Sequence, residues 1–173
     1  MIFDYTNYAT SRLTDFLNYY KNRFGNKEPI FVCIGTPNVS GDSIGPYIGS
    51  LLQHEGFKVY GTIQEPVTAK KVNSLSRKLW VKNFLNRPII AIDACIGNSP
   101  FGTISITDCA TRPGAGCGKQ LNNLGNCSIA ITTASDTAKL FDVAETEVMY
   151  VASNLALAIK RSFRQNETLE NVG

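Results

Sequence analysis

Two aspartates each follow a short apolar segment that has the composition of a buried strand. Asp42 lies in a glycine-containing loop after residues 30–34, and Asp93 directly follows residues 88–92. A carboxylate at the end of an apolar strand is costly to bury without a partner or a task. Two carboxylates at one site do not both ionise cheaply, so one is expected to hold a proton. Such a pair can activate a water molecule and protonate a leaving group without any histidine.

Other residues near this edge have structural interpretations that the sequence leaves open. Asp42 itself stands just before an expected helix and could be its N-cap, accepting backbone N–H bonds from the first turn. Glu65 ends a further expected strand, where it could reach the two aspartates or could be a solvent-facing acid in a turn. His54 lies on the polar side of an expected helix near its end, where the helix dipole favours a surface histidine.

A glycine-rich segment, residues 107–119, includes the end of an expected strand and could face the same site. Glycines permit close backbone approach to a ligand, and consecutive N–H groups can bind an oxyanion. A purely structural tight turn is the alternative. The segment is not a P-loop, because Pro113 and Gln120 stand where that motif needs glycine and Ser or Thr. The residues that could contact a substrate here are Pro113, Gly114, Gly116, Gly118 and Lys119.

The overall composition excludes several classes of function. One histidine against fourteen acidic residues excludes His-rich zinc sites and H-E-x-x-H metalloproteases. The net charge of +3 comes from scattered Lys and Arg, so no direct nucleic-acid partner is expected. The longest strongly apolar run, residues 148–159, is too short to span a bilayer, and no secretory signal is visible. The five cysteines contain no C-x-x-C pair and are expected to be reduced, which predicts a cytoplasmic protein.

The apolar pattern predicts strands that alternate with helices. The expected strands cover residues 30–34, 58–63, 88–92, 102–107 and 128–133, and the expected helices cover residues 6–24, 43–56, 68–84 and 144–163. Strands joined by helices indicate a mainly parallel sheet, and two late strands without a helix between them suggest an antiparallel member. We therefore predict an α/β fold, a hydrolase-like three-layer α/β/α sandwich with a mainly parallel mixed sheet. Ligands in such sheets bind outside the carboxyl ends of the strands.

The length of 173 residues is that of one domain, and no internal repeat is visible. We expect an N-terminal helix in residues 1–28 that packs on the domain, the α/β/α domain in residues 29–163, and a polar tail in residues 164–173. The two aspartates and the glycine-rich segment all fall in the middle part, so one domain would carry the whole site.

Three segments in this order resemble segments of the spore germination protease family. They are residues 35–46 (GTPNVSGDSIGP), 90–95 (IAIDAC) and 104–119 (ISITDCATRPGAGCGK). The resemblance covers about residues 29–133 and is greatest to the short, YyaC-type sporulation proteins. The surrounding superfamily includes the hydrogenase-maturation endopeptidases, and its fold is also a three-layer α/β/α sandwich.

The resemblance implies a function and a set of site residues. Germination proteases degrade the small acid-soluble proteins that coat spore DNA, and they are regarded as atypical aspartic endopeptidases with two essential aspartates. Those aspartates match Asp42 and Asp93. The implied catalytic residues are thus this pair, with substrate contacts expected from Gly35, Thr36, Asn38, Glu65, Pro113, Gly114, Gly116, Gly118 and Lys119.

The resemblance also implies partners and leaves two other functions open. The partner would be a spore protein or peptide, the compartment the cytoplasm of the forespore or the spore interior, and a homo-oligomer is left open. No cofactor is predicted. The hydrogenase-maturation branch adds a histidine to equivalent acids to bind a metal, but no histidine follows an expected strand here. The alternatives are a non-catalytic sporulation protein that binds a peptide or ligand in the same pocket, and a metal-dependent maturation-type endopeptidase.

Overall fold

The computed structural model describes residues 2–3, 7–83, 87–114, 118 and 120–164. The strands are β1 (Ile2–Phe3), β2 (Ile30–Cys33), β3 (Lys58–Tyr60), β4 (Ile89–Ile96), β5 (Ile104–Thr107) and β6 (Cys127–Ala134). The helices are α1 (Asn7–Arg23), α2 (Ile44–His54), α3 (Ala69–Asn83) and α4 (Glu145–Arg164), with 3-10 turns η1 (Ser40–Ser43) and η3 (Lys139–Phe141).

The strands form one six-stranded mixed sheet with the order β1-β5-β6-β4-β2-β3. Strands β3, β2, β4 and β6 are parallel neighbours, whereas β5 is antiparallel to β6 and β1 is antiparallel to β5. The predicted parallel sheet and its late antiparallel strand are therefore confirmed. Strand β1 was not predicted, because two residues are too few to produce a recognisable pattern.

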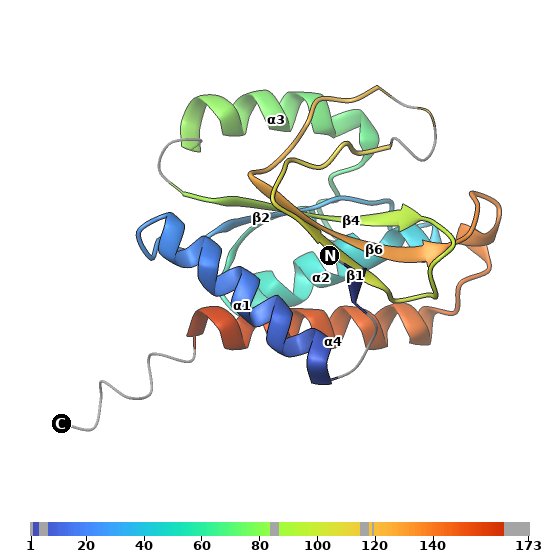
Figure 1. Ribbon diagram of the computed structural model, residues 1–173. Helices are drawn as coiled ribbons and strands as arrows, with labels where there is room; N and C mark the ends of the chain where they lie inside the picture. Colours follow the sequence, from blue (N-terminus) through green and yellow to red (C-terminus); the bar gives the residue numbers. More distant parts are fainter. Residues whose placement is uncertain (1, 4–6, 84–86, 115–117, 119, 165–173) are drawn as a thin grey trace.

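Helices cover both faces of this sheet, which confirms the three-layer α/β/α sandwich. Helix α3 lies on one face, and α1, α2 and α4 lie on the other (Figure 1). Successive side chains of β4 point to opposite faces of the sheet and so contribute to the hydrophobic cores on both faces. Ile90 and Ile92 pack with the three-helix layer, and Ile89 and Ala91 pack with α3. Continuous apolar runs such as residues 30–34 form fully buried strands for this reason.

The N-terminal helix α1 packs against α4 and belongs to the main core. Leu13, Leu17 and Tyr20 are buried in the same cluster as the sheet residues. Of the tail expected in residues 164–173, only Arg164 is described, and it is the last residue of α4. The other residues of that segment lie outside the described part of the chain.

Glycines allow α2 to approach the sheet closely. A Cβ atom added to Gly45 would overlap the carbonyl oxygen of Ile34, and one added to Gly49 would overlap that of Gly61. The first turn of α2 therefore lies directly against the end of β2. This contact sets the position of the chain between these two elements, which carries Asp42.

Candidate active site

A cavity of about 240 Å³ opens at the carboxyl edge of the sheet, on the side covered by α3. Its walls come from the end of β2, the outer half of β4, the first residue of α3, and the segment that follows β5. The lining residues are Ile34, Gly35, Thr36, Asp42, Ala69, Asp93, Ala94, Cys95, Ile96, Thr111, Arg112, Pro113, Gly114, Ala130 and Leu140. The two aspartates singled out by the sequence thus line the same cavity.

Asp93 reaches the cavity because β4 continues beyond the end of β2. The last ladder pair between the two strands is Cys33 with Ile92, and the Ile34 N–H donates to the Ile92 carbonyl oxygen at 2.8 Å. Beyond that point β4 pairs with β6 and its residues change from buried to half-buried. The expectation that the strand ends at residue 92 was wrong, because its pairing with β6 runs to Ile96.

The direction of the Asp93 side chain follows from alternation. Asp93 lies on the same face of β4 as Ile89 and Ala91, which pack toward α3, and its ladder partner on β6 is Ala130. Because an alanine side chain is small, space remains above the sheet at this position, and the cavity occupies it. An aspartate inside a strand is therefore at the base of the site.

Asp42 comes from η1, the 3-10 turn between β2 and α2. One hydrogen bond ties the turn to the chain before α4, from the Ser40 hydroxyl to the Val143 carbonyl oxygen at 2.5 Å, and one closes the turn itself, from the Ser43 hydroxyl to the Ser40 carbonyl oxygen at 2.6 Å. Gly35 lies so close to the Asp42 carbonyl that a Cβ atom there would overlap it. The N-cap position of α2 is Ser43, so the structure does not place Asp42 at the helix cap that the sequence had suggested.

The electrostatics of the site favour a protonated Asp93. Burial is the larger cause and the negative charge of Asp42 the second, and together they raise the pKa of Asp93 from 3.8 to about 8. The backbone N–H of Ala94 donates to the carboxyl group and acts in the opposite direction. Among the described ion pairs none involves Asp93. At neutral pH this side chain therefore holds a proton beside the charge of Asp42.

Only some of the predicted substrate contacts lie at the cavity. Gly35, Thr36, Pro113 and Gly114 line the cavity, whereas Asn38, Glu65 and Gly118 are exposed and are not among its described lining residues. Glu65 closes a tight turn instead, with its N–H donating to the Thr62 hydroxyl at 3.0 Å. Gly116 and Lys119 lie outside the described residues. His54 is exposed at the end of α2, on the surface as expected.

Several lining residues were missed by the sequence analysis. Arg112 and Thr111 lie within the glycine-rich segment, which drew attention for its glycines alone. Leu140 comes from η3, far along the chain, and had no local signal. Cys95 lies two residues after Asp93, its Sγ is 3.6 Å from the Thr132 hydroxyl, and burial raises its pKa, so it contributes a neutral thiol.

Two features are absent from the described residues. They contain no group of three or more His, Cys, Asp or Glu side chains placed to hold a metal ion. None of the helices in the described part of the chain is long and apolar enough to cross a membrane. The two acids share their cavity with apolar residues and with Arg112.

The protein is thus an α/β/α sandwich with two acids in a cavity at the carboxyl edge of its sheet. The chain belongs to the family described as "Protein of unknown function (DUF1256)", whose model matches residues 1–162. It is similar to the "Uncharacterized protein YyaC" of Bacillus subtilis (strain 168), with 32% identity over 173 residues that cover 91% of this chain and 82% of that protein.

Two solved structures show a more distant likeness. The [NiFe] hydrogenase maturation protease HybD from Thermococcus kodakarensis is 11% identical, with a TM-score of 0.40 that covers 75% of this chain and 99% of that one. The [NiFe] hydrogenase maturation protease HycI from Thermococcus kodakarensis KOD1 is 14% identical, with a TM-score of 0.46 that covers 84% and 99%. Likeness at this level carries no argument about the function of this chain.

Proposed function

We propose that this protein is an aspartic-type endopeptidase in which Asp42 and Asp93 act on one water molecule. The observation that supports this most directly is that both carboxyl groups line one cavity at the carboxyl edge of the sheet. A protonated acid beside a charged carboxylate is the arrangement that peptide hydrolysis by two acids requires.

The proposed reaction uses the two acids in different protonation states. Asp42 takes a proton from water, whose oxygen attacks the peptide carbonyl carbon, while Asp93 gives its proton to the carbonyl oxygen. In the second step the C–N bond breaks, Asp42 passes its proton to the leaving amine, and a hydroxyl proton of the intermediate returns to Asp93. Gly114 lines the cavity with a positive φ of 73°, and we assign its backbone N–H as a donor to the substrate carbonyl oxygen while Asp93 transfers its proton there.

The proposed substrates are small acid-soluble spore proteins, in a sporulating cell. This part of the proposal depends on the resemblance of residues 35–46, 90–95 and 104–119 to germination proteases. Two of these segments supply the aspartates, and the third supplies Thr111 to Gly114 of the cavity wall. The segments that carry the resemblance therefore supply ten of the fifteen described lining residues of the cavity.

The test is an incubation of the purified protein with a small acid-soluble spore protein, followed by mass spectrometry of the products. We expect cleavage by the wild type, and a loss of at least about 100-fold in rate for Asp93→Asn and for Asp42→Asn, as for removal of a general acid or base. Glu65→Gln is the matched control, because Glu65 is an exposed acid that is not among the described lining residues. Circular dichroism and thermal unfolding would show that each variant is folded.

The same experiment separates the other two functions. Wild-type protein that binds the peptide without cleaving it, also after limited proteolytic activation, would contradict the proposal and favour a binding protein. Cleavage that stops on addition of a chelator and returns with a divalent cation would favour a metal-dependent endopeptidase. Cleavage by Asp93→Asn at the wild-type rate would contradict the role assigned to the two acids.

A further inference from the structure

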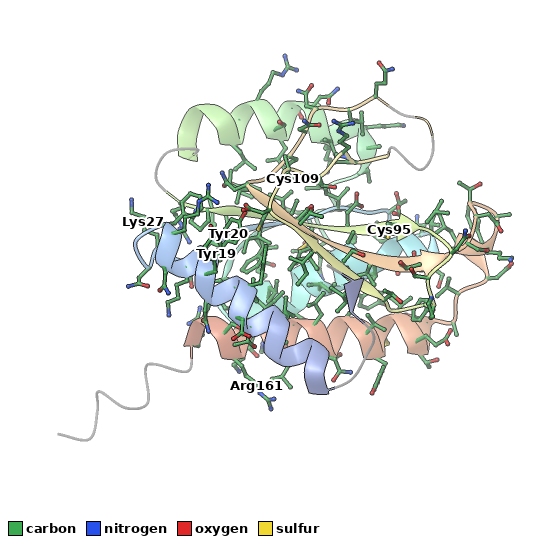
Figure 2. All side chains as sticks on the ribbon, in the orientation of Figure 1. Tyr19, Tyr20, Lys27, Cys95, Cys109 and Arg161 are labelled. Carbon is green, nitrogen blue, oxygen red and sulfur yellow. The ribbon has the colours of Figure 1, made fainter. Side chains whose placement is uncertain are left out.

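A second cavity, of about 290 Å³, lies between the C-terminal parts of α1 and α4. It is at the other end of the molecule from the two aspartates. Helix α4 begins next to Val143, at the carboxyl edge of the sheet, and ends at Arg164, which pairs with Glu28 just before β2. Cys95 of the first cavity and Arg161 of the second accordingly lie well apart (Figure 2).

Two cationic residues, the half-buried Lys21 of α1 and the exposed Arg161 of α4, line this cavity. Neither forms an ion pair or a side-chain hydrogen bond with any residue that the structure describes, and the described lining contains no Asp or Glu. Their neighbours in the same helical turns are all paired: Arg23 with Asp108, Lys160 with Glu55, and Arg164 with Glu28. Among the described residues, the two cations that line the cavity thus have no acidic partner.

The rest of the lining is neutral and polar. Asn18, Asn22 and Asn26 recur every four residues, so the first two lie on one face of α1 and the third follows in the turn after it, with a positive φ of 59°. Ser162 is buried; its hydroxyl donates to the Ala158 carbonyl oxygen at 2.9 Å and lies 3.3 Å from the hydroxyl of Thr14. The amides can donate hydrogen bonds to an anion and can also bind hydroxyl groups attached to it.

Cations in the last turn of a helix also stabilise the helix dipole, and this accounts for each residue separately. It does not account for cations of two different helices facing one hollow together with three amides. A purely dipolar role would also be served by Arg23 and Arg164, which lie in the same last turns and are paired.

We propose that this second cavity binds a small multivalent oxyanion, of the phosphomonoester or polycarboxylate class. Two positive charges match such an anion, and the volume is close to the lower limit for small-molecule sites. The neutral amides and hydroxyls suit the non-ionic part of the same molecule. This site is separate from the proposed peptidase site, so either proposal can fail alone.

The test is isothermal titration calorimetry of the full chain with inorganic phosphate, phosphoserine and citrate, with serine and sodium chloride at equal ionic strength as negative controls. We expect saturable binding of at least one multivalent anion and none of serine. Lys21→Gln and Arg161→Gln should each weaken the affinity about tenfold, as for loss of one charge-assisted hydrogen bond. Phosphoserine above citrate would identify the phosphomonoester class, and the reverse order the polycarboxylate class.

Lys27→Gln is the matched control, because it removes the same charge from the exposed turn after α1 without being in the described lining (Figure 2). It should bind the anion as the wild type does. Equal weakening by Lys27→Gln would show general charge screening and would contradict the proposal, as would unchanged binding by both cavity variants. Absence of binding for all three anions would also overturn it, and thermal unfolding of each variant would show that it is folded.

Discussion

One acid at each edge of the sheet has an opposite electrostatic environment: a half-exposed glutamate at the amino edge and a buried aspartate at the carboxyl edge. At the amino edge Glu28 accepts from Arg87 at 3.0 Å and from Arg164 at 3.2 Å, and the Arg164 guanidinium lies 4.6 Å from the centre of the Phe57 ring. Arg87 also donates to the Glu28 carbonyl oxygen at 2.7 Å. This acid joins the segment before β2, the residue before Pro88 and the end of α4, so its charge holds the chain together.

At the carboxyl edge the charge that raises the pKa of Asp93 is that of another acid, Asp42. Glu28, in contrast, is paired with two arginines. Burial and the charge of Asp42 raise the pKa of Asp93, and none of the described ion pairs compensates it. Close backbone contacts at glycines and the hydrogen bond from the Ser40 hydroxyl to the Val143 carbonyl oxygen hold the Asp42 turn against the sheet. A paired acid stabilises the fold, whereas an acid opposed by another acid keeps a proton that it can transfer.

The largest effect is expected from Gly45, which fixes the turn of Asp42. Gly45→Val would drive its Cβ atom into the carbonyl oxygen of Ile34. We expect a loss of more than about 5 kcal/mol, which equals the total stability of many domains. Urea unfolding would measure it, with Gly97→Ala as control, because an added Cβ atom at Gly97 meets nothing within 4 Å. A cooperatively folded Gly45→Val protein of wild-type stability would show that the glycine contact does not hold this edge.

The next effect concerns the proton on Asp93. Its pKa is about 8 in the folded protein and near 3.8 in the unfolded chain, so between these values the folded state binds one more proton. The free energy of unfolding therefore falls as pH rises, by at most about 1.4 kcal/mol per pH unit, until pH passes about 8. Asp93→Asn removes this loss, and we expect it to be more stable than the wild type by up to about 5 kcal/mol at pH 8 and by about 1–2 kcal/mol at pH 5.

Urea unfolding of both proteins from pH 5 to pH 8 would measure this difference. The comparison would fail if the stability difference between them did not change with pH. Glu65→Gln serves as the control for removing an exposed acid near the same edge. A more stable but inactive Asp93→Asn protein would show that the acid is retained for its chemistry and not for the fold.

A smaller effect is expected from Asp42→Asn. The charge of Asp42 is only the second cause of the raised pKa of Asp93, after burial. The substitution should therefore lower the pKa of Asp93 but leave it above its ordinary range. Carbon-detected NMR titration of the Asp93 carboxyl group would measure this directly. An unchanged pKa would show that the two side chains do not interact.

The fold and the two acids could be predicted because their signals are local. Continuous apolar runs marked β2 and the first half of β4, and helical periodicity marked the four helices. The rule that parallel strands bind ligands at their carboxyl ends brought Asp42 and Asp93 together. The second half of β4 could not be predicted, because Asp93 and Cys95 interrupt the apolar run while backbone pairing with β6 continues.

The remaining walls of the site depend on tertiary contacts. Leu140 enters the cavity only because η3 packs beside η1, and nothing in residues 139–141 indicates this. Glu65 shows the opposite error, since the end of a strand was expected to bring it to the site and a tight turn keeps it exposed. Strand ends predict which edge carries the chemistry, but turn geometry decides which side chains point into it.

The smallest effect on stability is expected at the amino edge, where removing an acid should lower the free energy of unfolding. Glu28→Gln removes the charge that Arg87 and Arg164 share, so this change should destabilise the protein where Asp93→Asn stabilises it. Because these side chains are partly exposed, the loss should be about 1 kcal/mol and should shrink at high salt. Urea unfolding at pH 8 in low and high sodium chloride would measure it. If Glu28→Gln were as stabilising as Asp93→Asn, the contrast between a paired acid and an acid opposed by another acid would be wrong.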